Sequence, residues 1–177
     1  MEHGEFHLAA ALRAHEQDVR AVAASTTSAT PTTPHTQLTQ YNTYLTGARD
    51  NLAILWSHAP NTSTPTSTPT ETTALKSSTT HVLPAHKLAA HAHWCTAVAI
   101  APDGAVLSAS ADKHIILWDL ATDAPKLVLE GHTATVTRLR VAAHGGLVFS
   151  SSWDHTGRVW TLDGECVRVL RGHEAAV

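Results

Sequence analysis

Residues 147–160 have the sequence LVFSSSWDHTGRVW, which predicts a strand, a tight turn and a second strand. Apolar residues lead into a run of small hydroxyl residues, Asp154 and Gly157 mark the turn, and the extended pattern resumes and ends on Trp160. A single hairpin would say little about the fold. This one carries weight because the chain repeats it.

The same pattern occurs at residues 105–119 and, less clearly, at residues 44–56. In all three copies an Asp stands six residues before a Trp, and a Ser or Thr stands four residues before the Asp. A second marker, a small residue followed by His, occurs at residues 14–15, 90–91, 131–132 and 172–173. The last three of these His residues are spaced by 41 residues both times.

A fixed period in the low forties with these two markers is typical of β-propellers, in which each blade is a sheet of four strands. A blade buries its faces only against neighbouring blades, and propellers typically close with about 4–8 of them. The predicted fold class is therefore an all-β propeller. The chain holds about three blades, and Val177 follows the first residues of a fourth, so we expect an incomplete ring from a fragment or a truncated gene model.

Composition excludes several classes of protein. The chain has 177 residues and a net charge of -3 with no basic block, which argues against nucleic acid as a partner. Its N-terminus does not resemble a signal peptide, and no apolar run approaches the ~20 residues of a membrane helix. Two cysteines do not indicate a disulfide framework, so we expect a reducing location in the cytoplasm and nucleus.

The repeats and two Thr-rich stretches predict the organisation of the chain. Residues 6–12 are predicted as a strand, because the similar segments 126–130 and 166–170 precede later His markers. The predicted segments are an N-terminal strand with the first strand of blade one (1–24), a Thr/Pro-rich insertion (25–40), the rest of blade one (41–58), a Thr/Ser/Pro-rich linker (59–81), blade two (82–125), blade three (126–165) and the start of blade four (166–177).

Each predicted blade contains one His, one Ser or Thr, one Asp and one Trp that recur at similar spacing. These residues are His15, Thr46, Asp50 and Trp56; His91, Ser108, Asp112 and Trp118; and His132, Ser150, Asp154 and Trp160. A Ser-His-Asp set invites comparison with a serine hydrolase, which stays the remote alternative. Threefold repetition and the lack of a Gly-x-Ser-x-Gly elbow favour a structural network instead, from indole to hydroxyl to imidazole to carboxylate. We therefore assign no catalytic residue and expect no enzyme.

Two further candidates for chemistry are weak. Cys95 occupies the position that Val19 and Val136 hold in the other repeats, which favours a buried small hydrophobe over a reactive thiol. Four His residues crowd residues 81–93, but their spacing matches no zinc pattern and no cysteine cluster joins them. We expect no metal and no cofactor.

The predicted partner-binding residues flank the first strand of each blade or precede the turn Asp, positions that lie on one face of a propeller. They are Asp18, Arg20, Arg49, Trp94, Thr96, Thr135, Thr137 and Trp153. Trp94 and Trp153 are not required by the hydrogen-bonded network, and tryptophan beside arginine is typical of interaction hot spots. The alternative is that these tryptophans merely cover strand ends.

These residues and spacings resemble the WD-repeat family. The opening Phe6-x-Leu-x-x-x-Leu-x-x-His15-x-x-Asp-Val-Arg20, the stretch 150–160 and the ending GHEAAV at 172–177 are similar to the propeller of the phospholipase A-2-activating protein family, whose fungal members are ubiquitin-fusion-degradation proteins. The resemblance implies a seven-bladed, non-enzymatic propeller that binds ubiquitin on one face. The Thr-rich insertions and the alanines at Ala14 and Ala90 depart from the family pattern.

From this resemblance we expect an adaptor in ubiquitin-dependent protein degradation that binds ubiquitin or ubiquitinated proteins. Other regions of that family bind an AAA unfoldase, and this sequence does not include them, so that partner is not expected here. The alternatives are a generic WD-repeat scaffold and a substrate receptor of a ubiquitin ligase.

Overall fold

The computed structural model describes residues 14–26, 42–58, 82–142 and 146–177, and this part of the chain forms twelve strands. The strand predicted at 6–12, most of the insertion at 25–40 and the whole linker at 59–81 lie outside the described residues.

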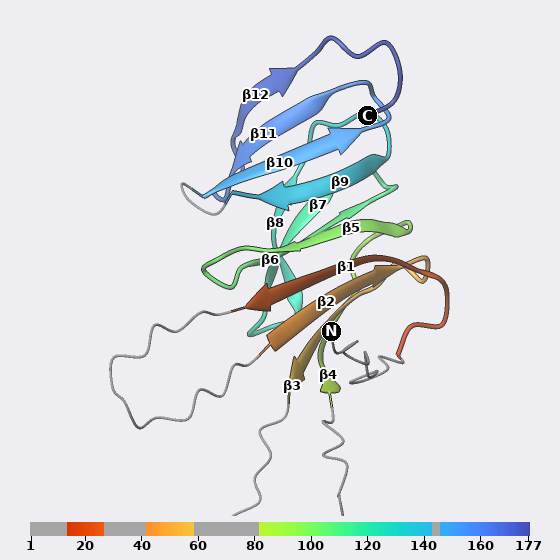
Figure 1. Ribbon diagram of the computed structural model, residues 1–177, viewed down its shortest axis with the longest axis vertical. Coiled ribbons are helices and arrows are strands. Elements are labelled where there is room, and N and C mark those ends of the chain that lie inside the picture. Colours follow the sequence, from red (N-terminus) through yellow and green to blue (C-terminus); the bar gives the residue numbers. More distant parts are fainter. Residues whose placement is uncertain (1–13, 27–41, 59–81, 143–145) are drawn as a thin grey trace, which may run out of the picture.

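The strands form three four-stranded antiparallel sheets (Figure 1). The first contains β1 (Val19–Thr26), β2 (Asn42–Ala48), β3 (Ala53–His58) and β4 (Val82–Leu88). The second contains β5 (Cys95–Ile100), β6 (Val106–Ser110), β7 (Ile115–Asp119) and β8 (Ala124–Leu129). The third contains β9 (Val136–Val141), β10 (Leu147–Ser152), β11 (Gly157–Thr161) and β12 (Cys166–Leu170). Each sheet has its strands in chain order, which confirms the predicted fold class.

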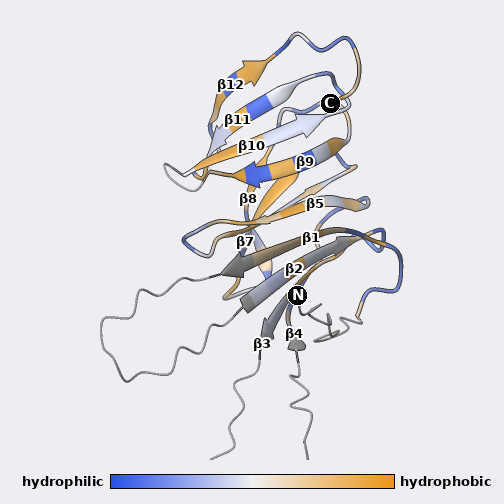
Figure 2. Cartoon of the chain, viewed as in Figure 1, coloured by the Kyte–Doolittle hydropathy of each residue, from blue (hydrophilic) through white to orange (hydrophobic). Residues whose placement is uncertain are grey.

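The sheets are stacked, and two hydrophobic clusters fill the spaces between them. Leu45, Leu55 and Leu88 of the first sheet meet Val98 and Trp118 of the second. On the opposite side of the second sheet, a separate cluster joins it to the third. The central strands β6 and β7 are thus buried on both faces, which explains why β7 is apolar from Ile115 to Trp118 and why β6 has only apolar or small residues. In Figure 2 the strands carry most of the hydrophobic residues, and the turns between them are mostly hydrophilic.

The hairpin at residues 147–160 forms as predicted, but its turn differs in detail. β10 and β11 pair from Leu147 with Thr161 to Ser151 with Gly157, so Gly157 begins a strand. The left-handed position of the turn is held by His155, with φ 66°. The turn tolerates a non-glycine residue there because the carboxylate of Asp154 accepts the backbone N–H of Thr156 at 3.0 Å and fixes the loop.

The predicted boundaries of the blades require a correction. The sheets are offset from the sequence repeats by one strand, because the last strand of each sheet pairs with the strand directly before it. β4 therefore belongs to the first sheet rather than to a blade at 82–125, and β8 belongs to the second sheet rather than to a blade at 126–165. β12 completes the third sheet and does not begin a fourth.

Candidate functional site

Each sheet contains the same hydrogen-bonded chain of four side chains. In the third sheet, Trp160 Nε1 donates to Ser150 Oγ at 2.8 Å, Ser150 Oγ lies 2.8 Å from His132 Nε2, and His132 Nδ1 lies 2.7 Å from Asp154 Oδ2. The corresponding distances in the other two sheets are all 2.8 Å. These two sets are His91, Ser108, Asp112 and Trp118, and His15, Thr46, Asp50 and Trp56.

The hydrogen bonds and the pKa of His132 indicate which atoms of this network carry protons. An indole N–H can only donate, so the Ser150 hydroxyl accepts from Trp160. Because burial lowers the pKa of His132, Nε2 is the unprotonated nitrogen and accepts the hydrogen of the Ser150 hydroxyl. His132 is then a neutral imidazole whose Nδ1–H donates to the Asp154 carboxylate. Asp154 also accepts the backbone N–H of Thr133 at 3.0 Å. Every polar group in this chain therefore has a partner.

Burial and hydrogen bonding shift the pKa values of the network carboxyls and of His132 so that the carboxylates stay charged and the imidazole stays neutral. Burial acts to raise the pKa of the Asp112 carboxyl, but hydrogen bonds from His91 and from two backbone N–H groups lower it to about 2. The pKa of Asp154 is likewise held well below its usual range by Thr156 and His132, against the effect of burial. Burial lowers the pKa of the His132 imidazole, and the Asp154 carboxylate opposes this only in part.

The hydroxyls of these chains are enclosed. Thr46, Ser108 and Ser150 are 3%, 0% and 6% exposed, and each oxygen already contacts an indole and an imidazole. The geometry ties the strands of a sheet together and leaves the hydroxyl no open side toward solvent.

The second candidate site is a concave surface of about 510 Å³ at one end of the three sheets, which we call the aromatic groove. Its lining residues are Arg20, His93, Trp94, Thr96, Ala111, Thr135, Thr137, Arg138 and Trp153. The structure thus brings together six of the eight residues that the sequence assigned to a partner-binding face. Trp94 and Trp153 come from adjacent sheets and are 40% and 59% exposed.

The two other predicted residues support the groove from outside. The Arg49 guanidinium lies over the Trp94 ring, 4.6 Å from its centroid, and Arg49 Nη1 lies 3.5 Å from Asp18 Oδ2. The His93 ring meets Trp94 edge-on with 4.7 Å between centroids. Trp94 is therefore in contact with both a cation and an imidazole.

Backbone geometry places the groove residues in the same way in all three sheets. The N–H groups of Arg49, Ala111 and Trp153 donate to the carbonyls of Asp18, Trp94 and Thr135, each at 3.0 Å. The innermost strand of each sheet also has a β-bulge. The bulged residues are Arg20, Thr96 and Thr137. A bulge redirects the side chain of the extra residue, and here it turns all three toward the groove.

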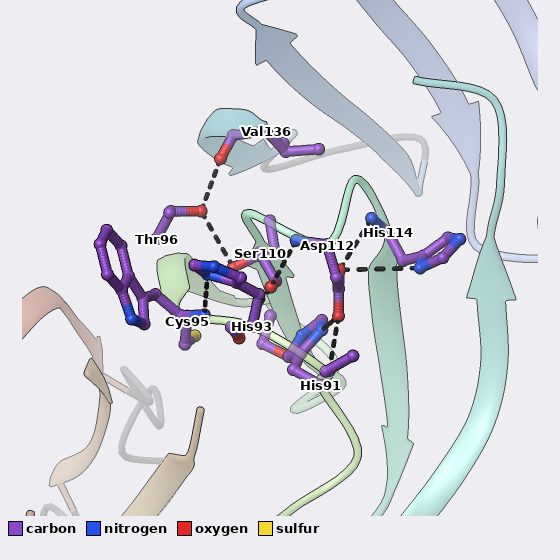
Figure 3. Close-up of polar contacts among 12 residues, drawn as sticks. His91, His93, Cys95, Thr96, Ser110, Asp112, His114 and Val136 are labelled. Atoms are coloured by element: carbon purple, nitrogen blue, oxygen red, sulfur yellow. Dashed lines mark hydrogen bonds and ion pairs between the residues drawn. The ribbon is translucent and has the colours of Figure 1, made fainter. Parts of the chain in front are cut away.

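The two bulged threonines also connect adjacent strands. Thr96 Oγ1 contacts the Val136 carbonyl oxygen in the third sheet (Figure 3). The distance between these atoms is 2.5 Å, and Thr96 Oγ1 lies 3.1 Å from the Ala109 carbonyl oxygen in its own sheet. Thr137 Oγ1 lies 2.5 Å from the carbonyl oxygen of Val177. Both hydroxyls are thus engaged within the protein. The exposed side chains that line the groove are those of Arg20, His93, Trp94, Arg138 and Trp153.

Three lining residues, His93, Ala111 and Arg138, are not among the eight that the sequence assigned to the partner-binding face. A signal for Arg138 was present, because it occupies the position that Ala21 and Ala97 hold on the innermost strands of the other sheets. An arginine where two repeats have alanine marks a local departure from the scaffold. His93 carried no comparable signal.

The crowded histidines of residues 81–93 do not form one site. His86 pairs with Asp123 at 2.5 Å, His91 belongs to the network and His93 lines the groove, whereas His81 lies outside the described residues. The described residues contain no group of three side chains that could hold a metal ion. They also contain no helix long and apolar enough to cross a membrane.

Cys95 is fully buried, and this burial, together with the nearby Asp112 and Asp50 carboxylates, raises the pKa of its thiol to about 12. A thiol with this pKa is protonated near neutral pH and has little nucleophilic character.

Comparison with known proteins gives one family match and several relatives that match part of this chain. The family "WD domain, G-beta repeat" matches residues 80–119 and 124–161. Cross-pathway control WD-repeat protein 2 of Flammulina velutipes is 40% identical over 83 residues, which cover 43% of this chain and 26% of that protein. Phospholipase A-2-activating protein of Xenopus laevis is 34% identical over 97 residues, 51% of this chain and 12% of that protein. Pre-mRNA-processing factor 19 of Mus musculus is 40% identical over 73 residues, 41% of this chain and 14% of that protein. The matches thus span about a quarter or less of each of these relatives.

Proposed function

Since this chain contains WD repeats, as the sequence predicted, we propose that it is a non-enzymatic protein-interaction module that binds ubiquitin or ubiquitinated proteins through the aromatic groove. In this proposal it serves as an adaptor in ubiquitin-dependent protein degradation in the cytoplasm and nucleus.

The observation that carries the protein-binding role is the convergence of Trp94 and Trp153 on one concave surface beside Arg20 and Arg138. Tryptophan and arginine are the residues most enriched among interaction hot spots, where a large side chain can lose contact with water on binding. Trp94 is already oriented by Arg49 and His93, so it loses little side-chain freedom when a partner binds. The three hydrogen-bonded networks hold the sheets that carry these residues.

Ubiquitin as the partner is supported by the resemblance of residues 6–20, 150–160 and 172–177 to the phospholipase A-2-activating protein family and by the 34% identity to its Xenopus laevis member. The other two relatives share the repeats as well, so a general scaffold is the outcome against which the ubiquitin assignment is tested.

The test is isothermal titration of the protein with mono-ubiquitin. We expect saturable binding that Trp153→Ala weakens at least about tenfold, since truncating a hot-spot residue typically costs ~2 kcal/mol or more. Phe149→Ala is the matched control, because Phe149 is 41% exposed but does not line the groove, and it should bind as the wild type does. No heat of binding to ubiquitin would indicate a scaffold for another partner.

A fluorophosphonate probe tests the non-enzymatic part of the proposal. Ser150 should remain unlabelled in the folded protein, because its hydroxyl is buried between Trp160 and His132. Stoichiometric labelling of Ser150 would instead assign the chain to the serine hydrolases.

A further inference from the structure

The aromatic groove has a one-sided charge. Arg20 on β1 and Arg138 on β9 both line it, and His93 lies beside them, but no carboxylate is among the lining residues. A smaller depression of about 180 Å³ adjoins it along the inner edges of the first strand of each sheet. Arg20 and Arg138 line this depression too, and Arg140 adds a third cation. The two arginines thus stand between the tryptophans and the inner edges of the sheets.

These cations have no counter-ion within the described part of the chain. None of the three arginines, Arg20, Arg138 and Arg140, makes an ion pair with a described residue, and all three are exposed. Arg49 differs, because its charge is balanced by Asp18 and its guanidinium is stacked on Trp94. Like charges that gather in a concave surface raise the local potential and attract an anion.

The scaffold does not require these arginines. Arg138 stands where Ala21 and Ala97 lie in the first two sheets, and Arg140 stands where those sheets have Ala23 and Ala99. Ala97 and Ala99 are buried in the cluster between the second and third sheets. A small side chain therefore meets the structural need at these positions, and the third sheet has replaced it with a long cation twice.

We propose that the aromatic groove selects an acidic peptide segment, in which Asp or Glu side chains stand next to a large apolar residue. This inference rests on the protein-binding role proposed above and adds the chemistry of the segment that is recognised. The apolar residue packs on Trp153, and a carboxylate accepts hydrogen bonds from Arg20 or Arg138. Guanidinium groups bind carboxylates through paired N–H donors, which makes the interaction directional as well as electrostatic.

A peptide fits the groove better than a nucleic acid does. The two depressions, at about 510 and 180 Å³, have room for a few side chains rather than for a tracked backbone. The chain as a whole has a net charge of -3, which disfavours binding of a long polyanion. A short acidic segment can still bind, because its few charges are balanced by the arginines of the groove.

The test uses a fluorescein-labelled peptide that contains Asp, Glu and Leu, together with a counterpart in which Asn and Gln replace the acids. Binding is followed by fluorescence anisotropy at low and at physiological salt. We expect the acidic peptide to bind at least about tenfold more tightly than its amide counterpart, with a preference that weakens as salt screens the charges. Equal binding of the two peptides, or no binding of either, would overturn the proposal.

Variants of the protein localise the effect. The double variant Arg20→Gln/Arg138→Gln should lose the preference for the acidic peptide, whereas Arg168→Gln should keep it, because Arg168 is exposed on β12 but lines neither depression. The double variant Arg20→Glu/Arg138→Glu should prefer a Lys-containing peptide. Equal losses in the Gln double variant and in Arg168→Gln would show that general charge, not the groove, binds the peptide. A single-stranded oligonucleotide that displaces the peptide at lower concentration would instead assign the groove to nucleic acid.

Failure of this inference can be told apart from failure of the ubiquitin assignment. If ubiquitin does not bind but the acidic peptide does, only the ubiquitin partner is wrong. If ubiquitin binding depends on Trp153 but not on Arg20 and Arg138, and the acidic and amide peptides bind alike, the acidic preference is wrong.

Discussion

Thr96 and Val136 join two sheets through a single polar contact, with the Thr96 hydroxyl 2.5 Å from the Val136 carbonyl oxygen. Thr96 is the extra residue of a β-bulge, and without the bulge its side chain would follow the alternation of the strand. Most other contacts between the second and third sheets are apolar and not directional. The hydroxyl therefore contributes to fixing how the two sheets are rotated against each other.

Replacement of this hydroxyl by a methyl group should weaken the protein. Thr96→Val retains the shape of the side chain but leaves the Val136 carbonyl without this donor, so we expect the free energy of unfolding to fall by about 1 kcal/mol. Urea unfolding measures the change. Thr133→Val, at an exposed position, is the control and should unfold at the wild-type midpoint.

Loss of a carboxylate from a hydrogen-bonded network should cost more. Asp154→Ala leaves the buried His132 without its acceptor and removes the bonds that fix the turn, so we expect destabilisation by about 2–3 kcal/mol. Thermal unfolding followed by circular dichroism measures it. The exposed Asp163 offers a control, because Asp163→Ala should melt with the wild type. An unchanged melting temperature for Asp154→Ala would show that the network does not support the third sheet.

Acid should destabilise the protein in two steps. The pKa of His132 is lower in the folded protein than its ordinary value of 6.5, so below about pH 6.5 the unfolded chain binds the proton more readily. The stability that neutral His132 contributes is therefore present above this pH and is lost as the pH falls further. The Asp112 carboxyl, with a folded pKa of about 2 against 3.8, contributes stability above about pH 4 that is lost toward pH 2.

Urea unfolding between pH 7.5 and 5 measures the first of these steps. His132→Gln should flatten the decline in this range while lowering the stability at pH 7.5, since the buried network is broken at every pH. A decline that stays as steep in this variant would assign the titration to another group.

Gly47 should not tolerate a side chain. A Cβ atom there would lie 2.5 Å from the Cys95 sulfur and 2.9 Å from a methyl carbon of Val98, at the junction of the first two sheets. We expect Gly47→Ala to destabilise the protein by about 1–3 kcal/mol, because the sheets must move apart. Gly157→Ala is the matched control in another strand, where the nearest atoms would lie at 3.6 Å. Equal melting temperatures of the two variants would contradict the close approach.

The two cysteines should differ in reactivity. Cys95 is buried and the pKa of its thiol is raised to about 12, so iodoacetamide at about pH 8 should leave it unmodified in the folded protein. Cys166 is partly exposed and should be alkylated. Peptide mass spectrometry reads out both sites, and labelling in urea should modify both equally. Fast modification of Cys95 without urea would indicate that the first two sheets separate.

The sequence predicted the hydrogen-bonded networks because their members are fixed by short-range hairpin geometry. Ser108 pairs with Ile116, and Val106 with Trp118, so the indole lies diagonally across the hairpin from the hydroxyl at any site with this spacing. The repeat then copies the arrangement into each sheet. Local spacing was sufficient to predict three of the four members, because Ser108, Asp112 and Trp118 lie within one hairpin and only the His comes from outside it.

The sequence did not predict to which sheet each of the last strands, β4, β8 and β12, belongs. A strand such as β8 has the same alternating pattern whether it pairs with β7 or with the strand that follows, and the short turn at residues 120–123 decides in favour of β7. The composition of the groove was also only partly predictable. The bulge at Thr137 and the stacking of Arg49 on Trp94 depend on tertiary structure rather than on spacing.

The equal strand order of the three sheets has a consequence for how such a chain changes its length. A recombination that joins Leu88 to Glu130 would delete one full period and, with it, all four strands of the second sheet and no others. A crossover between β5 and the equivalent point after β9 would instead leave a chimeric sheet of β5, β10, β11 and β12, again with every strand partnered. Unequal crossing-over at any pair of equivalent positions thus adds or removes four strands, and every strand that remains still has a strand to pair with.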